Sequence, residues 1–513
     1  MRVTNLMMSN NALYNLQKQE QRLNNLDQQY TTQKKISSPS EDPIIATRAL
    51  KLNTTYSEVS QYVDKNIPDA LAWMSMTQSA LDNTQSMLSG IYEKCVQGNT
   101  DGLSDTDRRA IATTLAEYKD QIYQEGTSSY SGRFLFTGFK TDTNLVFTED
   151  TNEKYTISEG ISLDSVRSYS TVVNQTSAID EDVQAVPVRV DYNRLRVGYD
   201  KLDYEYAPVI ETVNYDDEGN EVRDTLLSVT NSFETYDDFI EAIESGTIAT
   251  DGVLNTDVVA YIADRGEFAL GDEANITLKA ALDGSNFDGV PQTVEVTYQK
   301  NSFEENQLRP EHYFTCTRVV DEGLDTEKTY KYTKKEEEIK YLVNYNQQMT
   351  VNTQAKDCYT HNMGRDIGEL VDIVNNAIAA EETMKELEKN YQALTEGTEE
   401  YEKAKQIYDN SVVEYELKTK IMQEAFAENE TRFQDYAVVF SNQATDVGSR
   451  EQRIELIKTR LENQQADVEQ LQSDNIDVDL SEIIVRYTSA IDVYNAALSA
   501  TSKSIVDTLL NYL

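Results

Sequence analysis

The chain has 513 residues, 39% of them hydrophobic and 26% charged, which is enough apolar material for about three domains with cores of their own. Its formal net charge of −43 argues against binding to nucleic acid or to an anionic membrane surface, because both require lysine and arginine to meet phosphate. No apolar run reaches the roughly 18 residues of a membrane span, and Cys95, Cys316 and Cys358 are too few and too far apart for a disulfide framework.

The N-terminal segment, residues 1–36, has the apolar spacing of a helix. Its larger apolar residues fall mostly at steps of three, four or seven, and those expected to face a partner are Leu6, Leu13, Leu16 and Leu23. Basic residues outnumber acidic ones here, whereas the reverse holds in residues 478–513, so we expect the two end helices to match each other in charge. The first residues, MRVTNLMMSNNALYNL, lack the apolar block and cleavage site of a standard signal peptide.

The stretch ISSPSEDPIIA, residues 36–46, predicts a joint between two helices. Pro39 cannot lie inside a helix, because it lacks an N–H and its ring clashes with the preceding turn. Asp42 followed by Pro43 is typical of an N-cap with proline at the first helical position. We therefore expect the first helix to end near Lys35 and a second helix to begin at Pro43.

Helical patterns continue after the joint and return near the C-terminus. We expect a break near Pro68, then a helix that opens with a capping box at Ser104 and Asp107 and ends at Gly126. From Phe433 to Leu471 the apolar residues keep one heptad register. These patterns predict a mainly α fold, in which the N- and C-terminal segments form a long antiparallel coiled-coil bundle.

The C-terminal segment carries the most regular heptad pattern of the chain. Such a stripe is more often the core of a single chain than a surface for a partner. Here two narrow helices about 50 Å long would leave apolar surface exposed if they paired only with each other, so we expect further cover. The stripe consists of Ile484, Tyr487, Ile491, Tyr494, Leu498, Thr501 and Ile505, with Leu509 one turn further.

The stretch GRFLFTGFK, which begins at Gly132, marks a change from helix to strand. Phe134 and Phe136 alternate with other residues, and Gly138 provides a turn, so the pattern predicts a β-hairpin. Beyond it, residues 141–360 contain alternating segments such as VPVRVDY and TVEVTY. We expect a β-rich, solvent-exposed variable domain there.

Several of these stretches resemble the flagellin superfamily. The start MRVTNLMM, the joint ISSPSEDPIIATRAL and the segment GNTDGLSDTDRRAIATTLAEYKDQI resemble its N-terminal part, and the run from Asn442 to Leu513 resembles its C-terminal part. The hairpin GRFLFTGFKTDTNLVF resembles the hook–filament junction branch, hook-associated protein 3, more than filament flagellin. The resemblance covers residues 1–147 and 430–513, and residues 148–360 carry none.

The resemblance implies a structural protein of the bacterial flagellum, without catalytic residues, metal or cofactor, that joins the hook to the filament. Residues 1–36 and 478–513 would be disordered in the free monomer and would form the inner core of the assembly. Residues 37–140 and 361–477 would form the helical bundle with its hairpin. The implied partners are further copies in a ring, hook-associated protein 1 on the hook side, flagellin on the filament side and an export chaperone. The protein would be extracellular, exported by the flagellar type III route without a cleaved signal peptide.

Other functions remain open from the sequence. An enzyme is disfavoured, because His312 and His361 lie in no HExxH motif and the spacing of Cys358 and His361 has no second ligand pair. A divergent filament flagellin is the main alternative. A second alternative is an adhesin, in which the tyrosines of residues 148–360 would bind a glycan.

Overall fold

The structure, a computed structural model, describes residues 5–100, 102–175, 186–215, 221–250, 253–285, 290–321 and 327–506. The chain forms two compact units, which are described separately below. The first unit comprises Met1–Leu71, Tyr341–Met349 and Glu451–Leu513, and the second comprises Ala72–Lys340 and Thr350–Arg450. Among the described residues, no helix is both long and apolar enough to cross a membrane.

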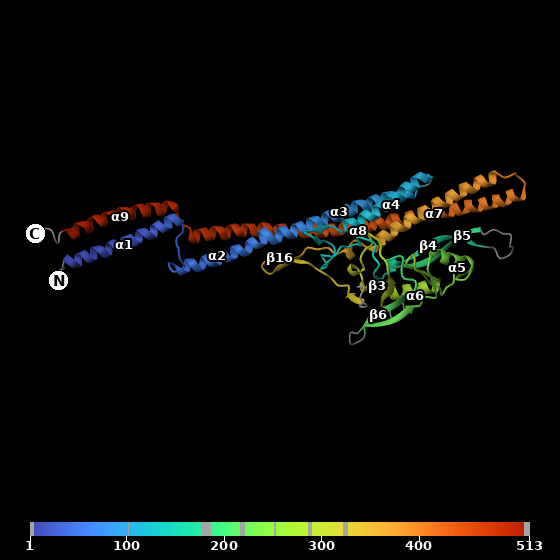
Figure 1. The fold of residues 1–513 in the computed structure, drawn as a ribbon, viewed down its shortest axis with the longest axis horizontal. Coiled ribbons are helices and arrows are strands. Elements are labelled where there is room, and N and C mark those ends of the chain that lie inside the picture. The colour runs from blue at the N-terminus through green and yellow to red at the C-terminus, as the bar shows by residue number, and fades with distance from the viewer. Residues whose placement is uncertain are drawn as a thin grey trace. The chain divides into compact units, whose positions relative to one another are not determined.

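The first unit is mainly helical. Helices α1 (Asn5–Thr32) and α9 (Leu480–Val506) lie side by side (Figure 1). Helix α2 (Pro43–Gln61) is held to the end of α8 (Glu399–Ile476) by two side-chain hydrogen bonds. Gln465 Nε2 donates to Ser60 Oγ at 2.8 Å, and Asn475 Nδ2 donates to the Ile45 carbonyl at 3.1 Å. The predicted pairing of N- and C-terminal helices is therefore confirmed.

The break expected near Pro68 is wrong, because α2 continues into α3 (Ile67–Gly98) through a π-helical turn, Tyr62–Asn66. The Ile67 N–H bonds to the Tyr62 carbonyl, five residues earlier. Since Pro68 has no N–H of its own, the wider turn accommodates it without ending the helix. The hairpin of β16 (Lys340–Asn344) and β17 (Gln347–Thr350) meets this turn, where Asn66 Nδ2 donates to the Leu342 carbonyl at 2.9 Å.

The long helices of the second unit are α4 (Asp105–Glu125) and α7 (His361–Gln392), with the adjoining parts of α3 and α8. Helix α4 begins with the predicted capping box, in which Ser104 Oγ accepts the Asp107 N–H at 3.3 Å. In α8 the predicted heptad register is confirmed from Phe433 to Val468, since residues seven apart are buried, whereas Leu471 at its end is 54% exposed. The buried residues seven apart are Phe433, Phe440, Val447, Ile454, Leu461 and Val468.

The β-rich region also lies in the second unit, and it confirms the expected insertion of mainly β structure. It contains two helices that the sequence did not indicate, α5 (Tyr236–Glu244) and α6 (Asp272–Asp283). Its strands are β1 (Ser129–Tyr130), β2 (Arg133–Phe134), β3 (Lys154–Ile161), β4 (Val166–Gln175), β5 (Val186–Arg196), β6 (Val209–Tyr215), β7 (Glu221–Leu227), β8 (Asn231–Phe233), β9 (Ala249–Thr250), β10 (Val253–Leu254), β11 (Val259–Ile262), β12 (Glu267–Leu270), β13 (Thr293–Lys300), β14 (Thr315–Asp321) and β15 (Glu327–Tyr332).

Two larger sheets build the cores of this region. One has six antiparallel strands in the order β15-β14-β3-β13-β6-β7, and the other has five in the order β4-β5-β12-β11-β8, where β8 pairs with β11 in parallel. One apolar core contains residues from both sheets and from α6, including Tyr155, Val296 and Phe268. A second core lies under α5, where Phe239 packs with Val190 of β5.

A buried group of ion pairs joins the five-stranded sheet region to α7. Asp366 of α7, whose side chain is fully buried, pairs with Arg196 and with Arg167 at 3.0 Å, and it accepts the Tyr436 hydroxyl at 2.8 Å. Glu369, one turn further along α7, pairs with Arg196 at 2.9 Å. Because a buried charge without a partner is costly, these pairs fix α7 against the strands.

Candidate assembly interface

The joint between α1 and α2 is built from two chain segments rather than one. Helix α1 ends at Thr32, and the next residue, Gln33, adopts the left-handed conformation with φ of 57°. The Val478 N–H then donates to the Gln33 carbonyl at 3.0 Å, and the Lys35 N–H donates to the Ile476 carbonyl at 2.7 Å. The break before α9 is therefore bonded to the break after α1, so both end helices turn at the same place.

The residues predicted for the joint lie where the pattern puts them. Pro39 lies in a tight turn that the Glu41 N–H closes by donating to the Ser38 carbonyl at 3.1 Å. Asp42 caps α2, since its Oδ1 accepts the N–H groups of Ile44 at 2.9 Å and Ile45 at 3.2 Å, and Pro43 is the first residue of the helix.

A second cap at the joint was missed from the sequence. Asp479 Oδ1 accepts the N–H groups of Ser481 at 2.8 Å and Glu482 at 3.2 Å, so it caps α9 as Asp42 caps α2. The signal was present, because Asp479 followed three residues later by Glu482 is a helix-start signature. Helices α2 and α9, which both begin at the joint, are thus each capped by an aspartate side chain.

Helices α1 and α9 meet along an inner seam, which we define by Leu23 and Leu26 of α1 and Ile483, Tyr487 and Ala490 of α9. Leu26, Ile483 and Ala490 are buried, and Leu23 and Tyr487 are half-buried, as is the predicted Leu16 earlier in α1. Leu23 and Tyr487 pack against this cluster, and the ring of Tyr487 stacks on Tyr30 with centroids 5.6 Å apart.

The inner seam shares Tyr487 with the predicted stripe of α9, but its two buried residues, Ile483 and Ala490, each lie one position before a stripe residue. Three residues of the predicted stripe lie outside the inner seam, and together with Leu480, which was not predicted, we call them the outer stripe: Leu480, Ile484, Ile491 and Leu498. Ile484 is 42% exposed and Leu498 is 47% exposed, whereas Ile491 is half-buried. Apolar side chains spaced four and seven residues apart share one helix face, so α9 keeps an apolar face that α1 does not cover.

The remaining predicted interface residues differ in how far they are buried. Leu13 of α1 is 42% exposed and lies outside the inner seam, while Tyr494 of α9 is half-buried. Leu509 lies outside the described residues, as do the side chains of Leu6 and Ile505.

The hairpin residues belong to the second unit. Strands β1 and β2 form a two-residue hairpin, with positive φ at Ser131 and Gly132, as a type I′ turn requires. Phe134 ends the hairpin half-buried, and Gly138, with φ of 63°, lies in the following turn. Phe136 is fully buried, and its ring meets Tyr359 edge-on at 5.0 Å.

His361 and Cys358, which the sequence suggested for metal or catalytic chemistry, are both buried. Burial lowers the pKa of His361 to about 3 and raises that of the Cys358 thiol, so the imidazole is neutral and the thiol protonated near pH 7. Cys358 Sγ contacts the Gln354 carbonyl at 3.6 Å. Within the described ranges, no three histidine, cysteine or acidic residues gather as metal ligands would.

Comparison with known proteins places the resemblance in the N-terminal part. Residues 3–141 match the model of the bacterial flagellin N-terminal helical region. The flagellar hook-associated protein 3 of Salmonella typhimurium is 30% identical over 143 residues, which are 28% of this chain and 45% of that protein. The protein of the same name from Escherichia coli is 31% identical over 150 residues, 29% of this chain and 47% of that protein. The chain thus matches less than half the length of these relatives.

Solved structures of flagellar hook-associated proteins are also similar to this chain. A putative flagellar hook-associated protein from Vibrio parahaemolyticus has a TM-score of 0.35 at 13% identity, covering 85% of this chain and 100% of that one. The hook-associated protein 3 of Legionella pneumophila has a TM-score of 0.30 at 9% identity, covering 83% and 98%. The resemblance predicted from the start, the joint and the hairpin is confirmed, while that of the C-terminal run stays a prediction.

Proposed function

We propose that this chain, whose N-terminal segment belongs to the bacterial flagellin N-terminal helical family, is a structural protein that joins the hook of a flagellum to its filament. The match to two hook-associated proteins 3, over 143 and 150 residues, supports the junction role. The chain would act by packing against other subunits and would carry no catalytic residue.

One structural observation carries the proposal, namely the outer stripe of α9. Helix α1 covers one side of α9 and leaves Ile484 and Leu498 exposed at 42% and 47%. A contiguous apolar face on a long helix is unfavourable in water and indicates a surface that another molecule covers. In an assembly, the terminal helices of neighbouring copies would supply this cover, and the joint at Pro39 and Pro43 would separate them from the bundle.

The proposed partners follow from the position of a junction. Copies of this chain would form a ring, with hook-associated protein 1 on the hook side and flagellin on the filament side. Before assembly, an export chaperone would cover the exposed apolar face. The assembled protein would be extracellular, having left through the flagellar export channel without a cleaved signal peptide.

An antibody against the β-rich region, with gold detection in electron micrographs, tests the proposal. A junction protein gives one labelled band where hook and filament meet. Label along the whole filament would instead identify a filament flagellin and refute the junction role. Deleting the gene gives a second test, since cells should keep hooks and shed flagellin into the medium.

A further inference from the structure

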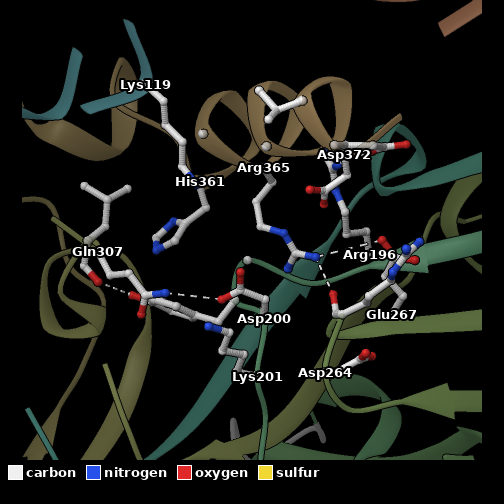
Figure 2. Close-up of a pocket in the computed structure, with 18 of the residues that line it drawn as sticks. Lys119, Arg196, Asp200, Lys201, Asp264, Glu267, Gln307, His361, Arg365 and Asp372 are labelled. Carbon is white, nitrogen blue, oxygen red and sulfur yellow. Dashed lines mark hydrogen bonds and ion pairs between the residues drawn. The ribbon is translucent and has the colours of Figure 1, made fainter. Parts of the chain in front are cut away.

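The cavity beside α7 in the second unit has a volume of about 600 Å³ and is lined by polar groups that bond to one another. Figure 2 shows Arg365, which lies 3.9 Å from Glu267 and donates to the Val197 carbonyl at 2.8 Å. In the same view, Gln307 Nε2 donates to Asp200 Oδ1 at 3.3 Å. Because these groups already have partners, the cavity selects no class of ligand.

In the first unit, by contrast, helix α8 carries two exposed arginines without a partner. They are Arg453 and Arg460, and neither has an acidic residue three or four positions away in either direction. Their side chains make no ion pair or hydrogen bond with any residue that the structure describes. Five other basic side chains of α8 each pair with an acidic residue four positions away: Lys403, Lys418, Arg432, Arg450 and Lys458. Two unpaired positive charges thus face solvent on a chain whose net charge is −43.

An exposed leucine lies between these arginines on the same face of α8. Leu456 is 74% exposed, and it follows Arg453 by three residues and precedes Arg460 by four. Side chains at these spacings are neighbours on a helix surface. We call Arg453, Leu456 and Arg460 the α8 patch. A leucine between two guanidinium groups fits an aromatic ring, because the ring can pack on the leucine while its face attracts the cations.

The hairpin of β16 and β17, also in the first unit, presents such a ring at its tip. The hairpin is held in place by burial of Val343 and Met349. Its turn consists of Tyr345 and Asn346, and the φ of 56° at Asn346 suits asparagine. Tyr345 is 82% exposed. Residues 341–355 contain no charged side chain, and depletion of charge together with aromatic residues is typical of the centre of a protein interface.

The hairpin and the α8 patch lie at nearly the same height along the first unit. Gln465 of α8 bonds to Ser60 of α2, and the hydrogen bonds between these helices show that they run in opposite directions. From that bond, Leu456 lies nine residues back along α8, about 13 Å, and Asn66, which bonds to the hairpin, lies six residues on, about 9 Å. Since Leu456 and Tyr345 are both exposed, the hairpin does not cover the patch of its own chain.

We propose that the hairpin of one copy docks on the α8 patch of a second copy of this chain, with Tyr345 over Leu456 and between the two arginines. This contact rests on the ring of copies proposed above. Copies related by rotation about an axis along the long helices keep each feature at its own height, so the hairpin of one copy faces the patch of the next. Two different patches that meet head to tail can close into a ring.

The charge of the chain supports a second copy as the partner. Copies that each carry a net charge of −43 repel one another over most of their surface. A contact between a basic patch and an uncharged hairpin avoids this repulsion. The α8 patch also leaves its arginines free to accept the carbonyl and amide oxygens of the hairpin as hydrogen-bond partners.

The test is photo-crosslinking in flagella isolated with their hooks. Tyr345→p-benzoylphenylalanine keeps an aromatic ring at the tip and makes it photoreactive. The matched control carries the same group at Tyr204, which is 44% exposed in the β-rich region. We expect light to give a covalent dimer of this chain from position 345 and none from position 204, with the crosslink in the peptide that contains Leu456. No dimer, a crosslink to a different flagellar protein, or a crosslink to another part of this chain would overturn the proposal.

Removing the arginines tests the other side of the contact. Arg453→Ala combined with Arg460→Ala should lower the yield of dimer from position 345 at least about threefold. Lys403→Ala, which removes an exposed basic side chain of α8 that pairs with Glu399, should leave the yield unchanged. Because all three side chains are exposed, the melting temperature of the purified subunit should stay near that of the original protein. An undiminished yield without the two arginines would refute the α8 patch as the docking site.

The crosslink and the antibody label distinguish this contact from the junction role. A dimer together with label along the whole filament would keep the contact between copies and remove the junction role. Label confined to the junction without a dimer would keep the junction role and overturn the contact.

Discussion

Two adjacent isoleucines of α9 separate the inner seam from the outer stripe. Ile483 is 2% exposed and packs in the cluster with Leu26, whereas Ile484 is 42% exposed and does not belong to that cluster. We predict that Ile484→Asp prevents assembly without harming the free subunit, and that Ile483→Asp disrupts the pairing of α1 and α9. The two variants have the same chemistry and differ by one position, so each controls for the other.

The magnitudes follow from these exposures. Fully burying an isoleucine is worth about 1.5–3 kcal/mol, so covering the 42% of Ile484 that remains exposed would contribute about 0.6–1.3 kcal/mol per subunit. An aspartate there loses this gain and adds several kcal/mol for a buried, unpaired charge. In the free subunit the change should stay within about 0.5 kcal/mol. Ile483→Asp removes a buried side chain, which alone costs about 2–5 kcal/mol.

The assay combines complementation with hydrogen exchange. In a strain lacking the gene, cells with Ile484→Asp should secrete the protein and lose their filaments, while the α9 amides of the purified variant exchange at the wild-type rate. Ile483→Asp should accelerate exchange throughout α9. Normal filaments with Ile484→Asp would refute the outer stripe as an assembly surface. Unchanged exchange with Ile483→Asp would mean that the ends are already unpaired in the free subunit, as the family resemblance implies.

Three further predictions concern the joint and the buried ion pairs. Asp42→Ala should destabilise the start of α2 by about 1 kcal/mol, seen as faster amide exchange at Ile44 and Ile45, and Asp42→Asn should retain most of the protection. Gln33→Gly should stabilise the end of α1 by about 1 kcal/mol, because φ of 57° strains a side-chain-bearing residue; slower exchange there would support this and faster exchange would contradict it. Burial alone would raise the pKa of Asp366, but Arg196, Arg167 and Arg432 lower it from 3.8 to about 2. The stability that this carboxylate contributes is therefore complete above about pH 4 and is lost as the pH falls towards 2, a change of about 2 kcal/mol in the free energy of unfolding. Measuring the free energy of unfolding against pH should show this change in the original protein and not in Asp366→Asn.

Local signals in the sequence were sufficient for the helices and the joint. Proline at positions 39 and 43 and the capping aspartate act within a few residues, so their effect does not depend on the rest of the fold. The heptad register of α8 was also readable, because Phe433 and Phe440 repeat at a fixed spacing. The π-helical turn before Pro68 was not, since whether a helix ends or widens at a proline depends on its neighbours.

Features that depend on contacts distant in sequence were not predictable. The offset between the inner seam and the predicted stripe arises because Ile483 and Ile484 are both isoleucine, and only the position of α1 decides which is buried. The ion pairs of Asp366 with Arg167 and Arg196 join residues 199 and 170 positions apart. No periodicity of either segment indicates that these charges meet.

The ion pairs also show that the β-rich region is held to the helical bundle at more than its two ends. An insertion held only at its two ends could be removed without effect on the bundle, but Asp366 and Glu369 of α7 receive their arginines from this region. Cutting it out would remove both arginines that pair with Glu369 and would leave Asp366 with only Arg432, at 3.7 Å, and the Tyr436 hydroxyl, and a Gly/Ser linker supplies no replacement for the lost pairs. A deletion that keeps the bundle folded therefore requires neutral replacements at both positions.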